Sequence, residues 1–139
     1  MISNFVNFIS TFGTDSPKEL PNIYSPLIEY EDPINKVQGL DHLHLVFEDT
    51  LKIFSEIKIE VKETSSTDHT AFVRWLMTYR FRKKDYSIDG VTLLEFDSSG
   101  LICKPTDYWD ASFPLYGTFP VLGFLMRAIK KMAAVKLPR

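Results

Sequence analysis

The segment from His69 to Arg82 constrains the fold most, because it alternates apolar and polar side chains over fourteen positions. One parity is apolar throughout and consists of Ala71, Val73, Trp75, Met77, Tyr79 and Phe81. The other parity is mainly polar, with Thr70, Arg74, Thr78, Arg80 and Arg82. Successive side chains of a strand point to opposite faces, so this pattern predicts a long strand with one apolar face. The chain must therefore build a sheet with a buried side.

Further strands are predicted on both sides of this segment. Residues 56–62 alternate in the same way, and residues 87–97 and 101–110 form a hairpin around the turn Asp97-Ser98-Ser99-Gly100. We expect Gly90 to mark a bulge in the first arm of that hairpin. A shorter strand at 27–31 should end at Asp32-Pro33, because proline restricts the residue before it to extended geometry.

Helices are predicted before and after these strands. Apolar residues recur at helical spacing in 2–12, and Ser16-Pro17 can open a second short helix that reaches about Tyr24. The clearest helix is 39–54, and a last one covers 121–135. Helices first, then antiparallel strands, then a closing helix indicate an α+β fold.

Length and composition narrow the class of protein. A chain of 139 residues with 45% apolar residues fits one domain, 1–139. Sixteen basic against eighteen acidic residues give no electrostatic footprint for nucleic acid, and no apolar run approaches the roughly 20 residues that span a membrane. With one cysteine, Cys103, and no basic, apolar leader at its start, we expect a cytoplasmic protein.

Four segments resemble the SnoaL-like branch of the nuclear transport factor 2-like superfamily, which includes the ketosteroid isomerases. They are Tyr30-Glu31-Asp32-Pro33 followed by Gly39 and a helix, the strand 71–75, the hairpin 90–100, and Thr106-Asp107-Tyr108-Trp109-Asp110. The resemblance covers about 24–131 and rests on the order and spacing of these segments. It implies a cone of curved antiparallel sheet wrapped around helices, a hydrophobic pocket open at one end, and a homodimer.

The resemblance assigns one face of strand 101–110 to the pocket, and Asp107 and Trp109 share that face. An aspartate in apolar surroundings favours its neutral form, so its raised pKa would suit it to general acid/base catalysis near neutral pH. The alternative is a structural carboxylate at the end of a strand. The same face should supply the side chains that contact a substrate, namely Trp75, Tyr79, Thr92, Leu94 and Trp109.

Asp32 occupies the position that resembles the catalytic base of ketosteroid isomerases. Those enzymes also use a tyrosine and a protonated aspartate, and the corresponding positions here hold Phe8 and Thr92. Phenylalanine cannot donate a hydrogen bond and threonine is a weaker donor than a carboxylic acid, so steroid-isomerase activity is not expected. The alternative for Asp32 is a turn carboxylate before Pro33 that accepts local backbone hydrogen bonds.

His44 lies near the edge of the apolar stripe of helix 39–54 and is a third catalytic candidate, although a packing histidine is the alternative. His42 and His44 point about 200° apart on a helix, so no metal site is predicted. No cofactor is expected, because glycine-rich phosphate loops are absent from the sequence.

Two functions remain open at this point. The first is a cofactor-free isomerase, cyclase or dehydratase that acts on an apolar, carbonyl-bearing molecule through Asp107, with Asp32 or His44 assisting. The second is a noncatalytic module of the same fold that binds a hydrophobic ligand or dimerises. Phe72 and Leu76 interrupt the polar parity of strand 69–82 and would suit such an interface.

Overall fold

A computed structural model describes residues 1–112 and 116–138. The chain divides into two compact units, Met1–Trp109 and Asp110–Arg139, which are described separately below. The sequence-based prediction of a single domain over 1–139 stays a prediction.

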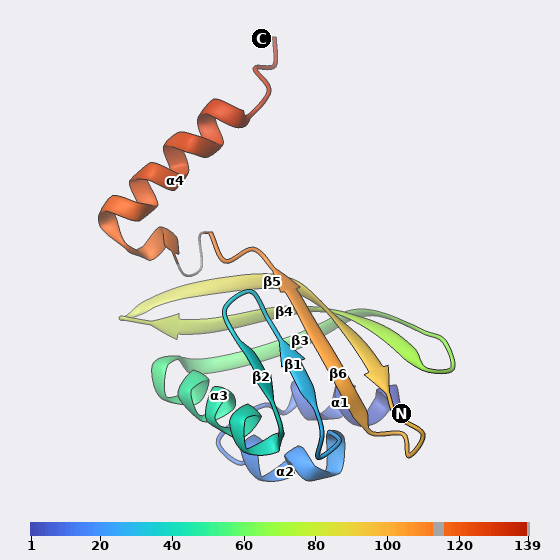
Figure 1. The fold of residues 1–139 in the computed structure, drawn as a ribbon. Helices are drawn as coiled ribbons and strands as arrows, with labels where there is room; N and C mark the ends of the chain where they lie inside the picture. Colours follow the sequence, from blue (N-terminus) through green and yellow to red (C-terminus); the bar gives the residue numbers. More distant parts are fainter. Residues whose placement is uncertain (113–115, 139) are drawn as a thin grey trace. The chain divides into compact units, whose positions relative to one another are not determined.

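The first unit is built on a curved, unclosed sheet (Figure 1). In the described residues its strands are β1 (Glu29–Glu31), β2 (Lys36–Gln38), β3 (Ser55–Ser66), β4 (Thr70–Phe81), β5 (Lys84–Phe96) and β6 (Ile102–Trp109). Their order across the sheet is β2-β1-β6-β5-β4-β3. The pairs are antiparallel except for β1 beside β6, where Glu31 pairs with Thr106 in parallel. This parallel contact places β1, the first strand in the sequence, next to β6, the last one.

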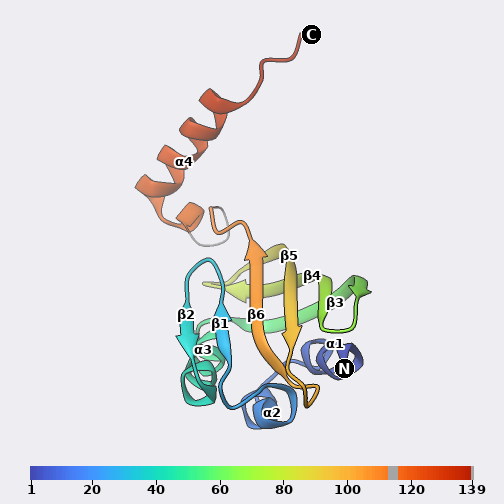
Figure 2. The same ribbon diagram turned by 45° about the vertical axis from the view of Figure 1, so that its right-hand side comes forward.

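Three helices gather on one side of this sheet (Figure 2). They are α1 (Ile2–Ser10), α2 (Ser16–Ile23) and α3 (Leu40–Ile53). The core lies between helices and sheet, and Phe8, Leu43 and Val73 are among its buried residues. The expected α+β class is therefore confirmed, and the predicted helices and strands are present, whereas β2 was not predicted.

The alternation in β4 sorts its side chains as the sequence predicts. Ala71, Val73 and Trp75 are buried, whereas Phe72 and Arg74 are exposed. Because β4 and β5 pair without a register shift from Thr70 to Phe81, the same alternation continues across the neighbouring strand. The sheet thus has an inner face toward the helices and an outer, more polar face.

The prediction of a bulge at Gly90 is wrong. Gly90 pairs regularly with Trp75 on one side and Trp109 on the other, and the shift between β5 and β6 lies between Glu95 and Phe96. This shift places Ile102 opposite Phe96 and leaves Cys103 as the extra residue. Cys103 is therefore partly exposed and its thiol donates to the backbone oxygen of Glu95 at 3.3 Å.

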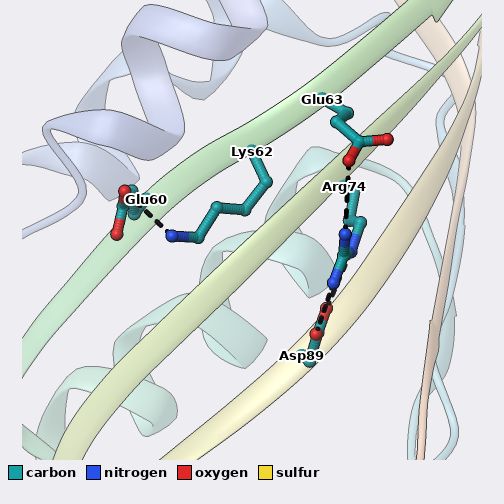
Figure 3. A network of polar contacts seen from close by, with 5 residues as sticks. All are labelled: Glu60, Lys62, Glu63, Arg74 and Asp89. Carbon is teal, nitrogen blue, oxygen red and sulfur yellow. Dashed lines mark hydrogen bonds and ion pairs between the residues drawn. The ribbon is translucent and has the colours of Figure 1, made fainter.

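Charged side chains link three strands on the outer face (Figure 3). The guanidinium of Arg74 on β4 lies 3.3 Å from Glu63 on β3 and 2.9 Å from Asp89 on β5. Beside it, Lys62 pairs with Glu60 at 3.0 Å. The polar parity of the long strand therefore forms exposed ion pairs between neighbouring strands.

The second unit holds a 3₁₀ turn, η1 (Tyr116–Thr118), and helix α4 (Pro120–Ala133). A Cβ on Gly123 would lie 2.5 Å from the backbone oxygen of Gly117, so glycine lets the turn pack directly on the helix. Lys130 of α4 pairs with Asp110 at 3.7 Å. Within the described part of the chain, no helix combines the length and apolar character needed to cross a bilayer.

Candidate functional site

A chain of hydrogen bonds crosses the inner face of the sheet from β4 to the turn after β1. Trp75 Nε1 donates to Thr92 Oγ1 at 2.9 Å, and Thr92 Oγ1 donates to Asp107 Oδ1 at 2.5 Å. The phenolic oxygen of Tyr30 lies 3.0 Å from Asp107 Oδ2 and 2.8 Å from Asp32 Oδ2. Two aspartates that are 75 positions apart in the sequence are thereby linked through one tyrosine.

The strand pairing explains this convergence. Thr92 pairs directly with Asp107 between β5 and β6, so their side chains stand next to each other on the same face. Tyr30 reaches them because β1 lies beside β6. Gly90 leaves room for the Trp75 indole, since a Cβ there would lie 2.5 Å from the ring carbon Cη2. Trp75, Thr92, Asp107 and Tyr30 are thus positioned by strands rather than by loops.

This arrangement shifts the pKa of Asp107 toward neutral pH. Burial raises the pKa of Asp107 to about 6. The hydrogen bonds from Thr92 and Tyr30 oppose this rise, and the negative charge of Asp32 adds to it. A carboxyl with a pKa near 6 can take up and release a proton close to neutral pH, which an ordinary aspartate does poorly.

Asp32 lies in the turn between β1 and β2. Its Oδ1 accepts hydrogen bonds from the backbone N–H of Ile34 at 2.7 Å and of Asn35 at 2.6 Å. The side-chain amide of Asn35 donates to Oδ2 at 3.2 Å. Asp32 thus has the local turn contacts that the sequence offered as its alternative role, and in addition it contacts Tyr30.

Tyr24 brings a second phenol toward this site. Its ring is buried and packs edge-on against Phe8 and Phe47, and the ring of Phe47 also contacts Tyr30. Burial and the charge of Asp107 raise the pKa of Tyr24 well above its usual value, so this phenol stays protonated. Tyr24 keeps only 2% of its surface exposed.

Some of the predicted substrate-contacting residues lie near Asp107 and others lie far from it. Trp75 and Thr92 are buried members of the hydrogen-bond chain, and Trp109 is half-buried, two positions beyond Asp107. Leu94, two positions after Thr92 on β5, is completely buried, so its contact with a ligand stays a prediction. Tyr79 lies four residues beyond Trp75, about 13 Å along the strand. There its ring stacks on Tyr86, at a centroid distance of 5.7 Å.

His44 is not brought to Asp107 by any described contact. It lies on α3, where its Nε2 contacts Glu48 Oε1 at 3.0 Å, one helical turn away. Both side chains keep about two fifths of their surface exposed. A catalytic role for His44 stays a prediction with no further support from the geometry.

Tyr30 is the residue that sequence reasoning missed. It belongs to the segment Tyr30-Glu31-Asp32-Pro33, but a strand of three residues gives too short an alternation to show which side chain faces inward. The sequence signal that could have found it is its spacing of two from Asp32, which places both side chains on the same side of an extended segment. In the described residues, no three His, Cys, Asp or Glu side chains converge as a set of metal ligands would.

Comparison with known proteins identifies the family. The family model for the SnoaL-like domain matches residues 5–104, and the chain belongs to this family. No curated protein sequence matches the chain.

Solved structures show the same fold at low sequence identity. A protein from Jannaschia sp. CCS1 that is assigned as a SnoaL-like polyketide cyclase aligns with a TM-score of 0.69 and 11% identity, over 97% of this chain and 92% of its own. A hypothetical protein with a ketosteroid isomerase-like fold from Catenulispora acidiphila aligns with 0.68 and 13%, over 80% and 85%. An M. tuberculosis epoxide hydrolase of the LEH-like type gives 0.64 and 11%, over 79% and 80%. At these identities the likeness shows the fold alone.

Proposed function

We propose that this protein binds a small apolar, carbonyl-bearing molecule and moves a proton on it through Asp107, as an isomerase, cyclase or dehydratase without a cofactor. The observation that carries the proposal is the placement of Asp107, a half-buried carboxyl held by Thr92 and Tyr30, whose burial raises its pKa to about 6. Small-molecule sites commonly set a few polar groups of this kind in apolar surroundings.

The chemistry follows from the protonation states. At neutral pH the Asp107 carboxylate can accept a proton from a carbon next to the ligand's carbonyl, and in its neutral form it can return that proton elsewhere. The protonated phenol of Tyr24 would donate a hydrogen bond to the carbonyl oxygen, where negative charge develops. Trp75 and Trp109 would flank the apolar part of the ligand.

The family and the neighbouring structures are consistent with this reaction class. Two of the neighbours named above are described as a polyketide cyclase and an epoxide hydrolase, and both act on small molecules by those names. At 11% identity, the structural likeness supports the fold, and the substrate of this chain has to be found by experiment.

A noncatalytic binding or dimerisation module is the second candidate. Phe72 stands on the outer face with 49% of its surface exposed, four positions before the partly exposed Leu76 on the same strand. An apolar side chain of this size on an otherwise charged face suits contact with a second copy of the chain. A homodimer is therefore part of the proposal, and the same sheet face would supply its interface.

Thermal unfolding against a panel of apolar ketones, terpenoids and polyketide-like aromatics tests the proposal. A ligand at a hundred times its dissociation constant should stabilise the fold by about 2.7 kcal/mol. With such a ligand in hand, Asp107→Asn should abolish turnover and keep the binding. Asp97→Asn is the matched control, because Asp97 serves a hairpin turn by accepting the N–H of Ser99 at 2.9 Å. Retained turnover in Asp107→Asn would contradict the proposal.

A further inference from the structure

The phenol of Tyr30 has one hydrogen and two carboxyl groups within hydrogen-bond distance. Its oxygen lies 2.8 Å from Asp32 Oδ2 and 3.0 Å from Asp107 Oδ2. A hydroxyl donates one hydrogen at a time, so with both aspartates ionised one short oxygen–oxygen contact would lack a hydrogen. A proton on Asp107 supplies it: the Asp107 O–H donates to Tyr30, and Tyr30 donates to Asp32.

We propose that Tyr30 shares one proton between Asp107 and Asp32, so that the phenol makes the protonation of Asp107 depend on Asp32. This inference rests on the proposed function of Asp107 and assigns Tyr30 as its positioning residue. Asp32 would then set how readily Asp107 holds its proton. The proton count is unchanged within the unit: when Asp107 gives its proton to the Tyr30 oxygen, the Tyr30 hydrogen passes to Asp32.

The surroundings of the three side chains favour this arrangement. Tyr30 is 6% exposed, so water does not compete freely for its hydroxyl. Asp32 already accepts three donors from the turn, which fixes its carboxylate against Tyr30. The other groups that act on Asp107 are Thr92, which donates to its far oxygen, and the buried phenol of Tyr24. Among these described groups none carries a positive charge.

The coupling predicts opposite effects of two conservative substitutions on the pKa of Asp107. Asp32→Asn removes a negative charge, and its new amide can donate to the Tyr30 oxygen and turn the Tyr30 hydrogen toward Asp107. Both changes stabilise the ionised form, so the pKa of Asp107 should fall by about one unit. Tyr30→Phe removes the hydrogen bond through which Tyr30 lowers the pKa of Asp107, so that pKa should rise.

Carboxyl-carbon NMR titration of the ligand-free protein measures these shifts, with Asp107→Asn identifying the signal. We expect Asp32→Asn to lower the Asp107 midpoint by about one unit in the wild-type background and by less than half of that in the Tyr30→Phe background. Equal shifts in both backgrounds would show that Asp32 acts by charge alone and would overturn the role of Tyr30. No shift in either background would overturn the coupling of the aspartates.

Two controls keep this result separate from the proposed function. Asp97→Asn changes a turn aspartate that does not act on Asp107, and Tyr86→Phe removes a phenol from the aromatic group at the far end of β4. Neither should move the Asp107 midpoint, and a shift of the same size in either would overturn the inference. A wild-type midpoint near the ordinary value of about 4 would instead count against the proposed function of Asp107.

Discussion

Asp107 and Asp89 stand on adjacent strands of one sheet but on its opposite faces. On the outer face Asp89 is held by Arg74 at 2.9 Å, and this hydrogen bond lowers the pKa of Asp89 below its usual value. On the inner face burial raises the pKa of Asp107 to about 6. The pKa of an aspartate in this sheet is therefore shifted in opposite directions on the two faces. The parity of its strand position decides whether its partner is an exposed guanidinium, as for Asp89, or the hydroxyl groups of the inner face, as for Asp107.

The two faces also differ in what a lost partner costs. An exposed ion pair contributes little to the stability of the fold, because water solvates either charge when the other is removed. A buried donor or acceptor without its partner loses solvation that nothing replaces. Substitutions around Asp107 should therefore change stability and titration strongly, and substitutions around Asp89 should change them weakly.

The largest effect is expected from Gly90→Ala. The new Cβ would lie 2.5 Å from Cη2 of Trp75, so the indole must move away from Thr92. Overpacking of this kind in a core costs roughly 1–3 kcal/mol, and here it also strains the bond from Trp75 to Thr92. Urea unfolding at neutral pH measures the loss.

Gly13→Ala is the matched control for this substitution. A Cβ at Gly13 meets its nearest atom at 3.8 Å, an ordinary contact, so its stability should stay close to that of the wild type. If both alanine variants unfold at the same urea concentration, the close approach of the indole to Gly90 is not what stabilises the inner face.

The smallest effect is expected from Arg74→Ala on the outer face. Its contacts with Glu63 and Asp89 are exposed, so the loss of stability should be well below that of Gly90→Ala. The pKa of Asp89 should rise toward its usual value, because its main partner is gone. Urea unfolding at low and high salt tests this, since salt screens exposed pairs. A loss as large as that of Gly90→Ala, unchanged by salt, would erase the contrast between the faces.

Strand parity carried most of what could be predicted about the site. Together with the family resemblance, which assigned the pocket face, it placed Trp75, Thr92 and Asp107 on one face, because a period of two is unambiguous over strands of eight residues or more. It could not place Tyr30, whose strand has three residues and pairs in parallel with β6. The strand at 36–38 was missed for the same reason of length.

Position along a strand was harder to predict than the face. Tyr79 has the same parity as Trp75 but lies near the other end of β4, in an aromatic group with Phe54 and Tyr86. A glycine inside a strand can mark either a bulge or the close approach of another group, and the sequence alone does not distinguish the two. The position of the Trp75 indole shows that close packing explains Gly90.

The pH dependence of unfolding tests the central claim most directly, with the wild type compared against Asp107→Asn. The pKa of Asp107 is raised on folding, so its contribution to stability is fully present below pH 4 and is lost as the pH rises through about 6. Asparagine can still accept from Thr92 and donate to Tyr30. We therefore expect the variant to gain between about 1 and 3 kcal/mol on the wild type from pH 4 to pH 8. Parallel profiles across this range would show that Asp107 is an ordinary carboxylate and would contradict the account.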